Sequence, residues 1–196
     1  MTLYDPGIEV PLIVSGRGVA RSEVRNEMIS NIDVLPTLLE WIGLEVPGNL
    51  HGRSFAGLFL GREYSSHKYI FAEKSYHTYY DPMRAVRSDE WKLIANFENA
   101  PWQETPPDFK NNARGYAPIA VALGYPEQYH PPIELYHLES DALETRNLAN
   151  DPEVRDVQIE LSRRLRAWME DTEDPLLAGP IPQGAYVERM GAFKRV

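Results

Sequence analysis

The hydrophobic and polar positions at the start of the chain predict a strand followed by a helix. Residues 8–14 form a mostly apolar run after the turn signal YDPG at positions 4–7, and such a run is typical of a buried strand. Residues 31–43 open with polar cap residues, carry Pro36 near the first turn and end at Gly43, which predicts a helix. The helical face that we expect in the core consists of Leu35, Leu38, Leu39 and Ile42.

The pattern changes after a connector at residues 45–66, which contains Gly, Pro and Arg turn signals. A hairpin is predicted around residues 88–90, which separate two short strand-like runs. The strands predicted in this region span residues 69–73, 83–87, 91–97 and 133–138. Residues 98–132 are rich in Pro and aromatic residues, and a stretch of that length usually serves function or covers a sheet. We therefore predict a division into residues 1–66 and residues 67–196.

A long helix is predicted near the C-terminus. The sequence Asp-Pro-Glu at 151–153 is a start signal, because proline suits the first helical turn and acids suit the positive end of the helix dipole. Arginines lie mostly off the apolar stripe and are interspersed with acids, which favours a solvated face over a calmodulin-type or membrane-surface role. The stripe consists of Val154, Val157, Leu161, Leu165 and Trp168.

Composition narrows the classes of function. The chain has 196 residues, of which 43% are hydrophobic and 25% charged, as in globular domains. Its net charge of -9 and its lack of a basic run argue against a nucleic-acid partner. No apolar stretch approaches the roughly 20 residues of a membrane span, so no membrane partner is expected. No secretory signal is visible, and the compartment stays unknown.

Common catalytic and metal-binding motifs do not occur in the sequence. There is no cysteine, which excludes disulfides, thiolate metal sites and cysteine nucleophiles. The five histidines show no spacing typical of a metal site, and no EF-hand-type calcium loop is present. No phosphate-binding glycine loop and no G-x-S-x-G motif occurs. We therefore predict no catalytic residue and no metal ligand in this chain.

One stretch, FAEKSYHTYYDPMRAVRS, offers candidate binding residues. It places His77 among tyrosines and Arg84 in a strand, and these two side chains could hold a sulfate, a carboxylate or a sugar. The alternative is a structural one, in which Arg84 pairs with a nearby acid and His77 is satisfied at a strand end. Both interpretations stay open at the level of the sequence.

Several phrases, taken in order, are similar to the C-terminal half of a sulfatase. They are TLYDPGIEVPLIVSGRG, ISNIDVLPTLLEWIGL, HGRSFAGLF, PMRAVRSDEWKLIANF and ELYHLESDALETRNLANDPE. The phrases PMRAV, ELY and TEDP most resemble the N-sulfoglucosamine sulfohydrolase branch. The resemblance runs over nearly the whole chain, except for residues 101–132.

This resemblance implies an α/β fold class (α+β within this chain). We expect the end of an alkaline-phosphatase-like α/β domain, followed by a four-stranded antiparallel sheet packed on a C-terminal helix. It also implies hydrolysis of a sulfate ester or sulfamate, with sulfated carbohydrate as the partner. Family members use a formylglycine made from Cys or Ser in a C-x-P-S-R-like motif, beside a calcium ion held by Asp and Asn. A periplasmic, secreted or lysosomal location is typical of the family.

The chain departs from the family pattern in its chemistry. It has no C-x-P-S-R-like motif, no Asp-Asp metal pair, and Met1 stands near where the family carries a sulfate-holding cation. We therefore expect the nucleophile to lie outside this chain, together with the metal that offsets the developing negative charge. We expect a fragment or a split reading frame that is inactive alone. Its exposed apolar face should then promote self-association.

Two other functions stay open. The chain could be a free-standing, non-catalytic module that binds carbohydrate or protein. It could also be part of a phosphate or phosphonate ester hydrolase of the same superfamily, although the phrases PMRAVR and ELYHLESD favour a sulfatase.

Overall fold

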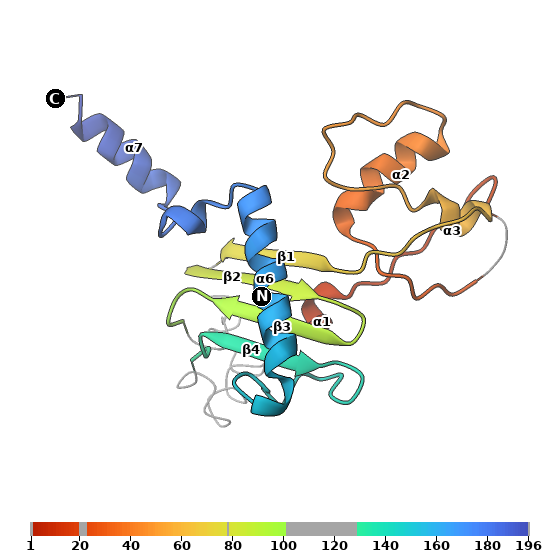
Figure 1. Cartoon of the computed structure of the whole chain (residues 1–196). Coiled ribbons are helices and arrows are strands. Elements are labelled where there is room, and N and C mark those ends of the chain that lie inside the picture. Colours follow the sequence, from red (N-terminus) through yellow and green to blue (C-terminus); the bar gives the residue numbers. More distant parts are fainter. Residues whose placement is uncertain (1, 20–22, 78, 101–128, 196) are drawn as a thin grey trace, which may run out of the picture.

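The computed structural model describes residues 2–19, 23–77, 79–100 and 129–195. Figure 1 shows a sheet crossed by a long helix, a smaller helical region beside it and a C-terminal helix that projects from the body. In chain order the elements are α1 (Asp5–Ile8), η1 (Asn31–Asp33), α2 (Val34–Trp41), α3 (Ala56–Leu60), β1 (Ile70–Tyr76), β2 (Tyr80–Arg87), β3 (Trp91–Asn96), β4 (Ile133–His137), η3 (Pro152–Val154), α6 (Arg155–Asp171), η4 (Pro175–Ala178) and α7 (Gly184–Phe193).

The sheet has the order β1-β2-β3-β4, and every neighbouring pair is antiparallel. The turn between β2 and β3 confirms the predicted hairpin, because Ser88 accepts and donates hydrogen bonds with Trp91 across it. All four predicted strands are present, and β1 and β2 extend three residues closer to their shared turn than predicted. The predicted four-stranded antiparallel sheet is therefore confirmed.

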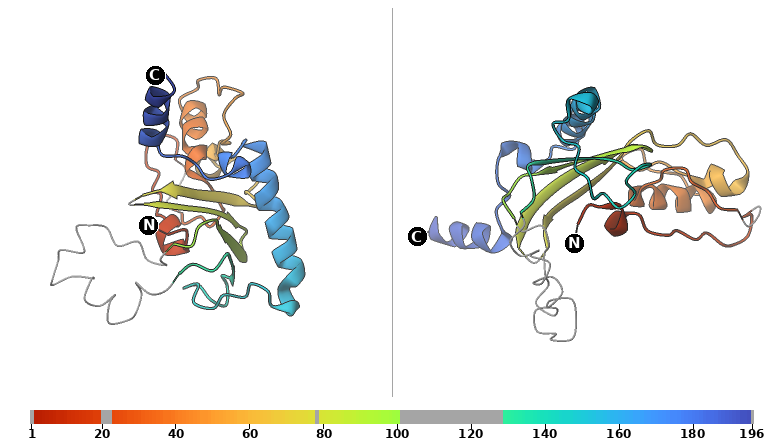
Figure 2. Two further views of the ribbon diagram at one scale, coloured as in Figure 1. Left: turned by 90° about the vertical axis from the view of Figure 1, so that its left-hand side faces the viewer. Right: turned by 90° about the horizontal axis from the view of Figure 1, so that it is seen from below.

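One face of the sheet packs against α6 (Figure 2). The predicted apolar stripe supplies two of the three buried side chains of this helix, Leu161 and Leu165, and the third, Met169, was not predicted. The ring of Trp168 stacks on that of Phe71 with centroids 5.0 Å apart. Burial of the stripe is the main reason why a helix of this polarity is stable here. The buried side chains between sheet and helix are Val86, Leu93, Ala95, Leu135, Leu161, Leu165 and Met169.

The opposite face of the sheet is covered in part by the start of the chain. Leu3 is buried there, and Tyr4 and Ile8 pack beside it. The tyrosine ring meets the ring of Tyr136 edge-on, with centroids 6.0 Å apart. Residues from the region predicted to end at residue 66 thus lie on the sheet of the second region, and the division at residues 66 and 67 stays a prediction. The sheet side chains on this face are Met83, Ala85, Ile94, Tyr136 and Leu138.

The strand predicted at residues 8–14 is wrong. Residues 5–8 form the helical turn α1, and residues 9–15 belong to no helix or strand. Pro6 lies in the first turn of α1, where its missing N–H costs nothing, and it favours the helical start. Within the described residues no strand lies beside residues 9–15 to pair with them, and most of their side chains are exposed.

The helix predicted at residues 31–43 is present as η1 and α2, but its predicted core face is wrong. Leu35, Leu38 and Ile42 are exposed, whereas Pro36 and Thr37 are buried. A buried carboxylate decides this orientation. Asp33 accepts hydrogen bonds from the backbone N–H of Ser30 at 2.7 Å and of Arg53 at 2.9 Å, so the polar side of the helix faces inward.

Among the described residues, no helix is both long and apolar enough to cross a bilayer. The helix α7 was not predicted, and none of its residues is buried.

Replacing Leu165 by Ala tests the packing of α6 on the sheet. The side chain is 3% exposed, and its removal leaves a cavity, so the free energy of unfolding should fall by about 3 kcal/mol. Leu177→Ala is the matched control, because Leu177 is half exposed and should change stability by no more than about 0.5 kcal/mol. Urea unfolding followed by circular dichroism measures both, and equal losses would contradict this packing.

Candidate functional site

The turn between β1 and β2 carries the first predicted binding residue. His77 is exposed at the bend that follows β1, and its backbone N–H donates to the carbonyl of Tyr79 at 3.3 Å. The flanking tyrosines, Tyr76 and Tyr80, face each other across the two strands with ring centroids 4.9 Å apart. His77 therefore lies on a turn that is flanked by the contacting rings of Tyr76 and Tyr80.

A segment distant in sequence fixes this turn. The hydroxyl of Tyr76 donates to the carbonyl of Ile181, and the backbone N–H of Ile181 donates to the hydroxyl of Tyr80 at 2.9 Å. Ile181 lies between η4 and α7, so the two tyrosines bind the chain between these two elements. The turn is held at both strands, which reduces the freedom of its backbone.

The second predicted residue, Arg84, lies inside the protein. It is 1% exposed, and its guanidinium binds Asp174 through two hydrogen bonds, Nε to Oδ2 at 2.5 Å and Nη2 to Oδ1 at 3.1 Å. Its other donors reach the backbone carbonyls of Lys74 and Met83 and the hydroxyl of Ser75. All five N–H donors of the guanidinium are therefore engaged within the chain.

The structure thus places the two predicted residues at different depths. Arg84 has the acid partner that the structural interpretation required, and it joins β2 to the segment after α6. His77 is exposed on the turn between β1 and β2. The sugar-binding role of both residues stays a prediction.

Arg84 and the N–H of Leu176 stabilise the ionised form of Asp174. Burial by itself would raise the pKa of this carboxyl, but the hydrogen bonds from Arg84 and from the N–H of Leu176, together with the charge of Arg84, outweigh burial and lower the pKa below its ordinary value. Asp174 also caps η4 through its bond to Leu176 at 3.0 Å. One carboxylate therefore holds a strand and the start of a helical turn together.

Sequence reasoning missed a second set of buried charges, on the sheet face that the start of the chain covers. Lys92 is fully buried, and it forms ion pairs with Asp5 and with Glu144, whose Oε1 lies 2.8 Å from its Nζ. Arg87 binds the same aspartate at 3.2 Å. Burial raises the pKa of Glu144 despite the lysine, whereas hydrogen bonds from Arg87 and Lys92 outweigh burial and lower that of Asp5.

Glu134 is the centre of a neighbouring polar cluster. Its carboxylate accepts hydrogen bonds from the hydroxyls of Tyr4 and Tyr136, both at 2.6 Å, and from the amide of Asn96 at 2.7 Å. His130 Nδ1 lies 3.4 Å from the same carboxylate. Burial would raise the pKa of Glu134, but these four partners together outweigh it and lower the pKa. The burial and the carboxylate raise the pKa values of both tyrosines.

The sequence held a signal for these clusters. Lys92 and Glu134 interrupt strands that are otherwise apolar, and a charge at such a position needs a buried partner. The partners could not be found from a single sequence, because Asp5 and Glu144 are far from Lys92 along the chain. Both clusters bind the N-terminal segment to the sheet.

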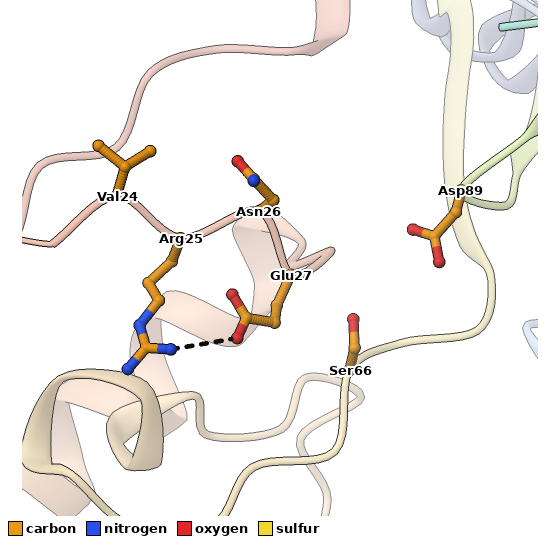
Figure 3. Close-up of a pocket in the computed structure, with 6 residues that line it drawn as sticks. All are labelled: Val24, Arg25, Asn26, Glu27, Ser66 and Asp89. Atoms are coloured by element: carbon orange, nitrogen blue, oxygen red, sulfur yellow. Dashed lines mark ion pairs between the residues drawn. The ribbon is translucent and has the colours of Figure 1, made fainter. Parts of the chain in front are cut away.

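An open hollow of about 590 Å³ lies between the segment before α2 and the turn after β2 (Figure 3). Arg25 is the cation in its lining, and it pairs with Glu23 at 2.7 Å and with Glu27 at 3.7 Å. The rest of the lining consists of Val24, Asn26, Glu27, Ser66 and Asp89. Since the acids outnumber the cation, this hollow is not suited to a sulfate group.

Calcium and formylglycine are the groups that the family resemblance implies for a complete enzyme. In the described part of the chain, no three His, Asp or Glu side chains are grouped so that they could hold a metal ion. The buried carboxylates Asp5, Asp174 and Glu134 accept hydrogen bonds from arginine, amide or tyrosine donors instead. The sequence has no cysteine, and no serine stands in a C-x-P-S-R-like motif from which formylglycine could be made. These residues do not fit either group.

The fold of this chain is similar to part of a larger solved structure. A crystal structure assigned as a sulfatase from Bacteroides thetaiotaomicron superposes with a TM-score of 0.61 at 23% identity, and the match covers 84% of this chain and 30% of that one. At this identity the likeness concerns the fold alone. It agrees with the predicted fold class, in which a sheet of this kind follows an alkaline-phosphatase-like domain.

Sequence comparison identifies the family. The family model described as N-sulphoglucosamine sulphohydrolase, C-terminal, matches residues 1–112, and the chain belongs to this family. An ulvan-active sulfatase of Formosa agariphila is 27% identical over 181 residues, which are 89% of this chain and 36% of the relative. Human N-sulphoglucosamine sulphohydrolase is 27% identical over 201 residues, which are 91% of this chain and 40% of the relative. The chain thus spans well under half the length of both relatives.

Replacing Asp174 by Asn tests the ion pair between Asp174 and Arg84. The variant leaves the buried Arg84 without a counter-charge, so the free energy of unfolding at pH 7 should fall by about 3 kcal/mol. The folded state lowers the pKa of Asp174, so its stabilising contribution is present above the unfolded pKa of about 3.9 and is lost as the pH falls through the folded value. The difference between the two proteins should therefore shrink below pH 4.

Asp171→Asn is the matched control, because Asp171 is exposed and its replacement should change stability by no more than about 0.5 kcal/mol. Urea unfolding between pH 3 and pH 7 measures all three proteins. A difference between Asp174→Asn and the parent that stays constant over this range would contradict the assignment.

Proposed function

We propose that this chain forms the C-terminal part of an enzyme that hydrolyses sulfate esters or sulfamates of a sulfated, heparan-type sugar. The observation that carries the proposal is the family match over residues 1–112, together with a relative named for N-sulphoglucosamine hydrolysis. The relative active on ulvan widens the substrate class to other sulfated glycans. The chemistry common to these names is cleavage of a sulfuryl group from a sugar.

We also propose that the chain alone has no turnover. Cleavage of a sulfuryl group needs a nucleophile and fixed positive charge where negative charge develops. The chain has no cysteine and no C-x-P-S-R-like motif for the formylglycine that the family uses. Its buried cations Arg84 and Lys92 bind carboxylates within the fold. The reactive centre would then come from a sulfatase part outside these residues.

Within this proposal, His77 contributes to the wall of the sugar site. Its support is the exposed position on a turn that Tyr76, Tyr80 and Ile181 hold in place. An imidazole N–H can donate to a sulfate oxygen or a sugar hydroxyl. Arg84 acts as a positioning residue, because its buried guanidinium joins β2 to Ser75 of β1 and to Asp174.

The absence of turnover is tested with the purified chain. In the presence of calcium, we expect no hydrolysis of p-nitrophenyl sulfate or of N-sulfoglucosamine above the buffer blank, because the nucleophile is missing. Human N-sulphoglucosamine sulphohydrolase is the positive control for the sulfamate. Robust hydrolysis by the chain would overturn the proposed inactivity.

The role of His77 is tested by binding, which needs no turnover. Adding millimolar N-sulfoglucosamine to the isotope-labelled chain should shift amide NMR signals of the β1–β2 turn, because a partial site binds weakly. His77→Ala should reduce these shifts at least severalfold. His51→Ala is the matched control, since His51 is exposed on the connector and should leave them unchanged. Equal effects of the two variants would argue against His77 as a sugar contact.

A further inference from the structure

Asp33 is a buried carboxylate that joins separate segments of the chain at the start of α2. It is fully buried, and its Oδ1 accepts a hydrogen bond from the backbone N–H of Arg53 at 2.9 Å. Its Oδ2 accepts from the backbone N–H of Ser30 at 2.7 Å and lies 2.8 Å from Nε2 of His67, shortly before β1. Histidine is the side chain that ordinarily changes its charge near neutral pH. The imidazole of His67 is 19% exposed, so it exchanges protons with the solvent.

One nitrogen of this imidazole has two partners that require opposite proton states. A carboxylate oxygen at 2.8 Å requires that Nε2 carries a proton and donates it to Asp33. The side-chain Nε–H of Arg53 lies 3.2 Å from the same Nε2, and it donates there only when Nε2 carries no proton. The two hydrogen bonds therefore exclude each other. The ring of His67 has two alternative arrangements, one bound to Asp33 and the other bound to Arg53.

We infer that His67 is a proton-dependent switch that holds the helical region around α2 to the chain leading into β1. A protonated ring carries hydrogens on both nitrogens, so it donates to Asp33 and cannot accept from Arg53. That bond is charge-assisted and therefore roughly twice as strong as a neutral one. A neutral ring can place its proton on Nδ1 and accept from Arg53, which leaves Asp33 without this donor. Loss of the proton therefore loosens the attachment of η1 and α2.

The nearest ionisable groups around this cluster do not replace the bond to the carboxylate. Burial raises the pKa of the Tyr64 hydroxyl above its ordinary value, so Tyr64 stays neutral while a histidine titrates. The charges that also act on this hydroxyl are those of Arg53, Asp33 and Glu27. Glu27 is itself paired with Arg25 at 3.7 Å.

Charges further along the neighbouring segments have other surroundings. The ammonium of Lys68 lies over the ring of Tyr69, 5.5 Å from its centroid. Asp89 lines the hollow of Figure 3 together with Ser66, the residue before His67. Among the described residues, Asp33 is the acid that pairs with His67. The proton on this ring therefore acts mainly through Asp33 and Arg53.

Amide hydrogen exchange of the purified chain tests this inference, and it needs no substrate. Protection factors, which correct for the intrinsic effect of pH on exchange, are compared at pH 5.5 and at pH 8. Because the bond to Asp33 is charge-assisted only at the lower pH, the amides of residues 31–41 should be about fivefold better protected there. The amides of α6 are the internal reference and should not share this change.

His67→Gln removes the titrating group but keeps an N–H donor for Asp33, so the change in protection should disappear. His51→Gln is the matched control, because His51 is exposed on the connector and its replacement should preserve the change. Circular dichroism verifies that both variants fold. A pH effect on residues 31–41 that persists in His67→Gln, or that α6 shares to the same extent, would overturn the inference.

The ¹⁵N chemical shifts of the His67 ring test the two arrangements in the parent chain, whether or not a variant folds. Both ring nitrogens should be protonated at pH 5.5, and Nε2 should move toward the shift of an unprotonated acceptor at pH 8. Arg53→Leu removes the competing donor and keeps the backbone N–H that binds Asp33, so its Nε2 should stay protonated at pH 8. A parent ring that keeps Nε2 protonated at pH 8 would contradict the switch.

Discussion

Charges that the strands carry into the interior determine how the rest of this chain is arranged. Burying an unpaired charge costs several kcal/mol, so each such side chain must find a partner of opposite sign. Arg84 finds Asp174, ninety positions along the chain, and Lys92 finds Asp5 and Glu144. These pairs bring three distant segments onto the sheet. The attraction within each pair largely offsets the cost of removing the charges from water, so the pairs add little net stability. Their main effect is to favour one arrangement of these segments over others.

Different kinds of interaction stabilise the contacts on the two faces of the sheet. On the α6 face an apolar stripe packs on valine and leucine side chains, and burial of apolar area dominates. On the other face Leu3 and Tyr4 share the contact with carboxylates, a lysine and an arginine. This second contact involves few residues, and it fixes the N-terminal segment to the sheet.

Local patterns predicted most of the sheet and the long helix. Alternating strands, the hairpin at residues 88–90 and the stripe of α6 depend on neighbours close in sequence, and all are present. Orientation and partners depend on distant residues and were missed. The apolar face of α2 points outward because the hydrogen bonds of Asp33 keep the polar side of the helix inside. Residues 8–14 are not a strand because no described strand lies beside them.

The candidate site shows the same division between local and distant information. The sequence singled out His77 among tyrosines and Arg84 in the next strand, and for Arg84 it allowed either an anion ligand or an internal acid as the partner. Asp174 supplies the acid, and only the fold shows that it reaches Arg84. The sequence offered a strand end for His77, whereas the contacts of Tyr76 and Tyr80 with Ile181 could not be predicted.

The inverted polarity of α2 has a consequence for local stability. The helix is held mainly by hydrogen bonds around Asp33 and Thr37 and by a few aromatic contacts, such as Trp41 with Phe59. Segments with few buried apolar contacts open at low free energy, often as a unit separate from the main core. The region from η1 to α3 should thus exchange its amide hydrogens and admit proteases while the sheet and α6 stay closed.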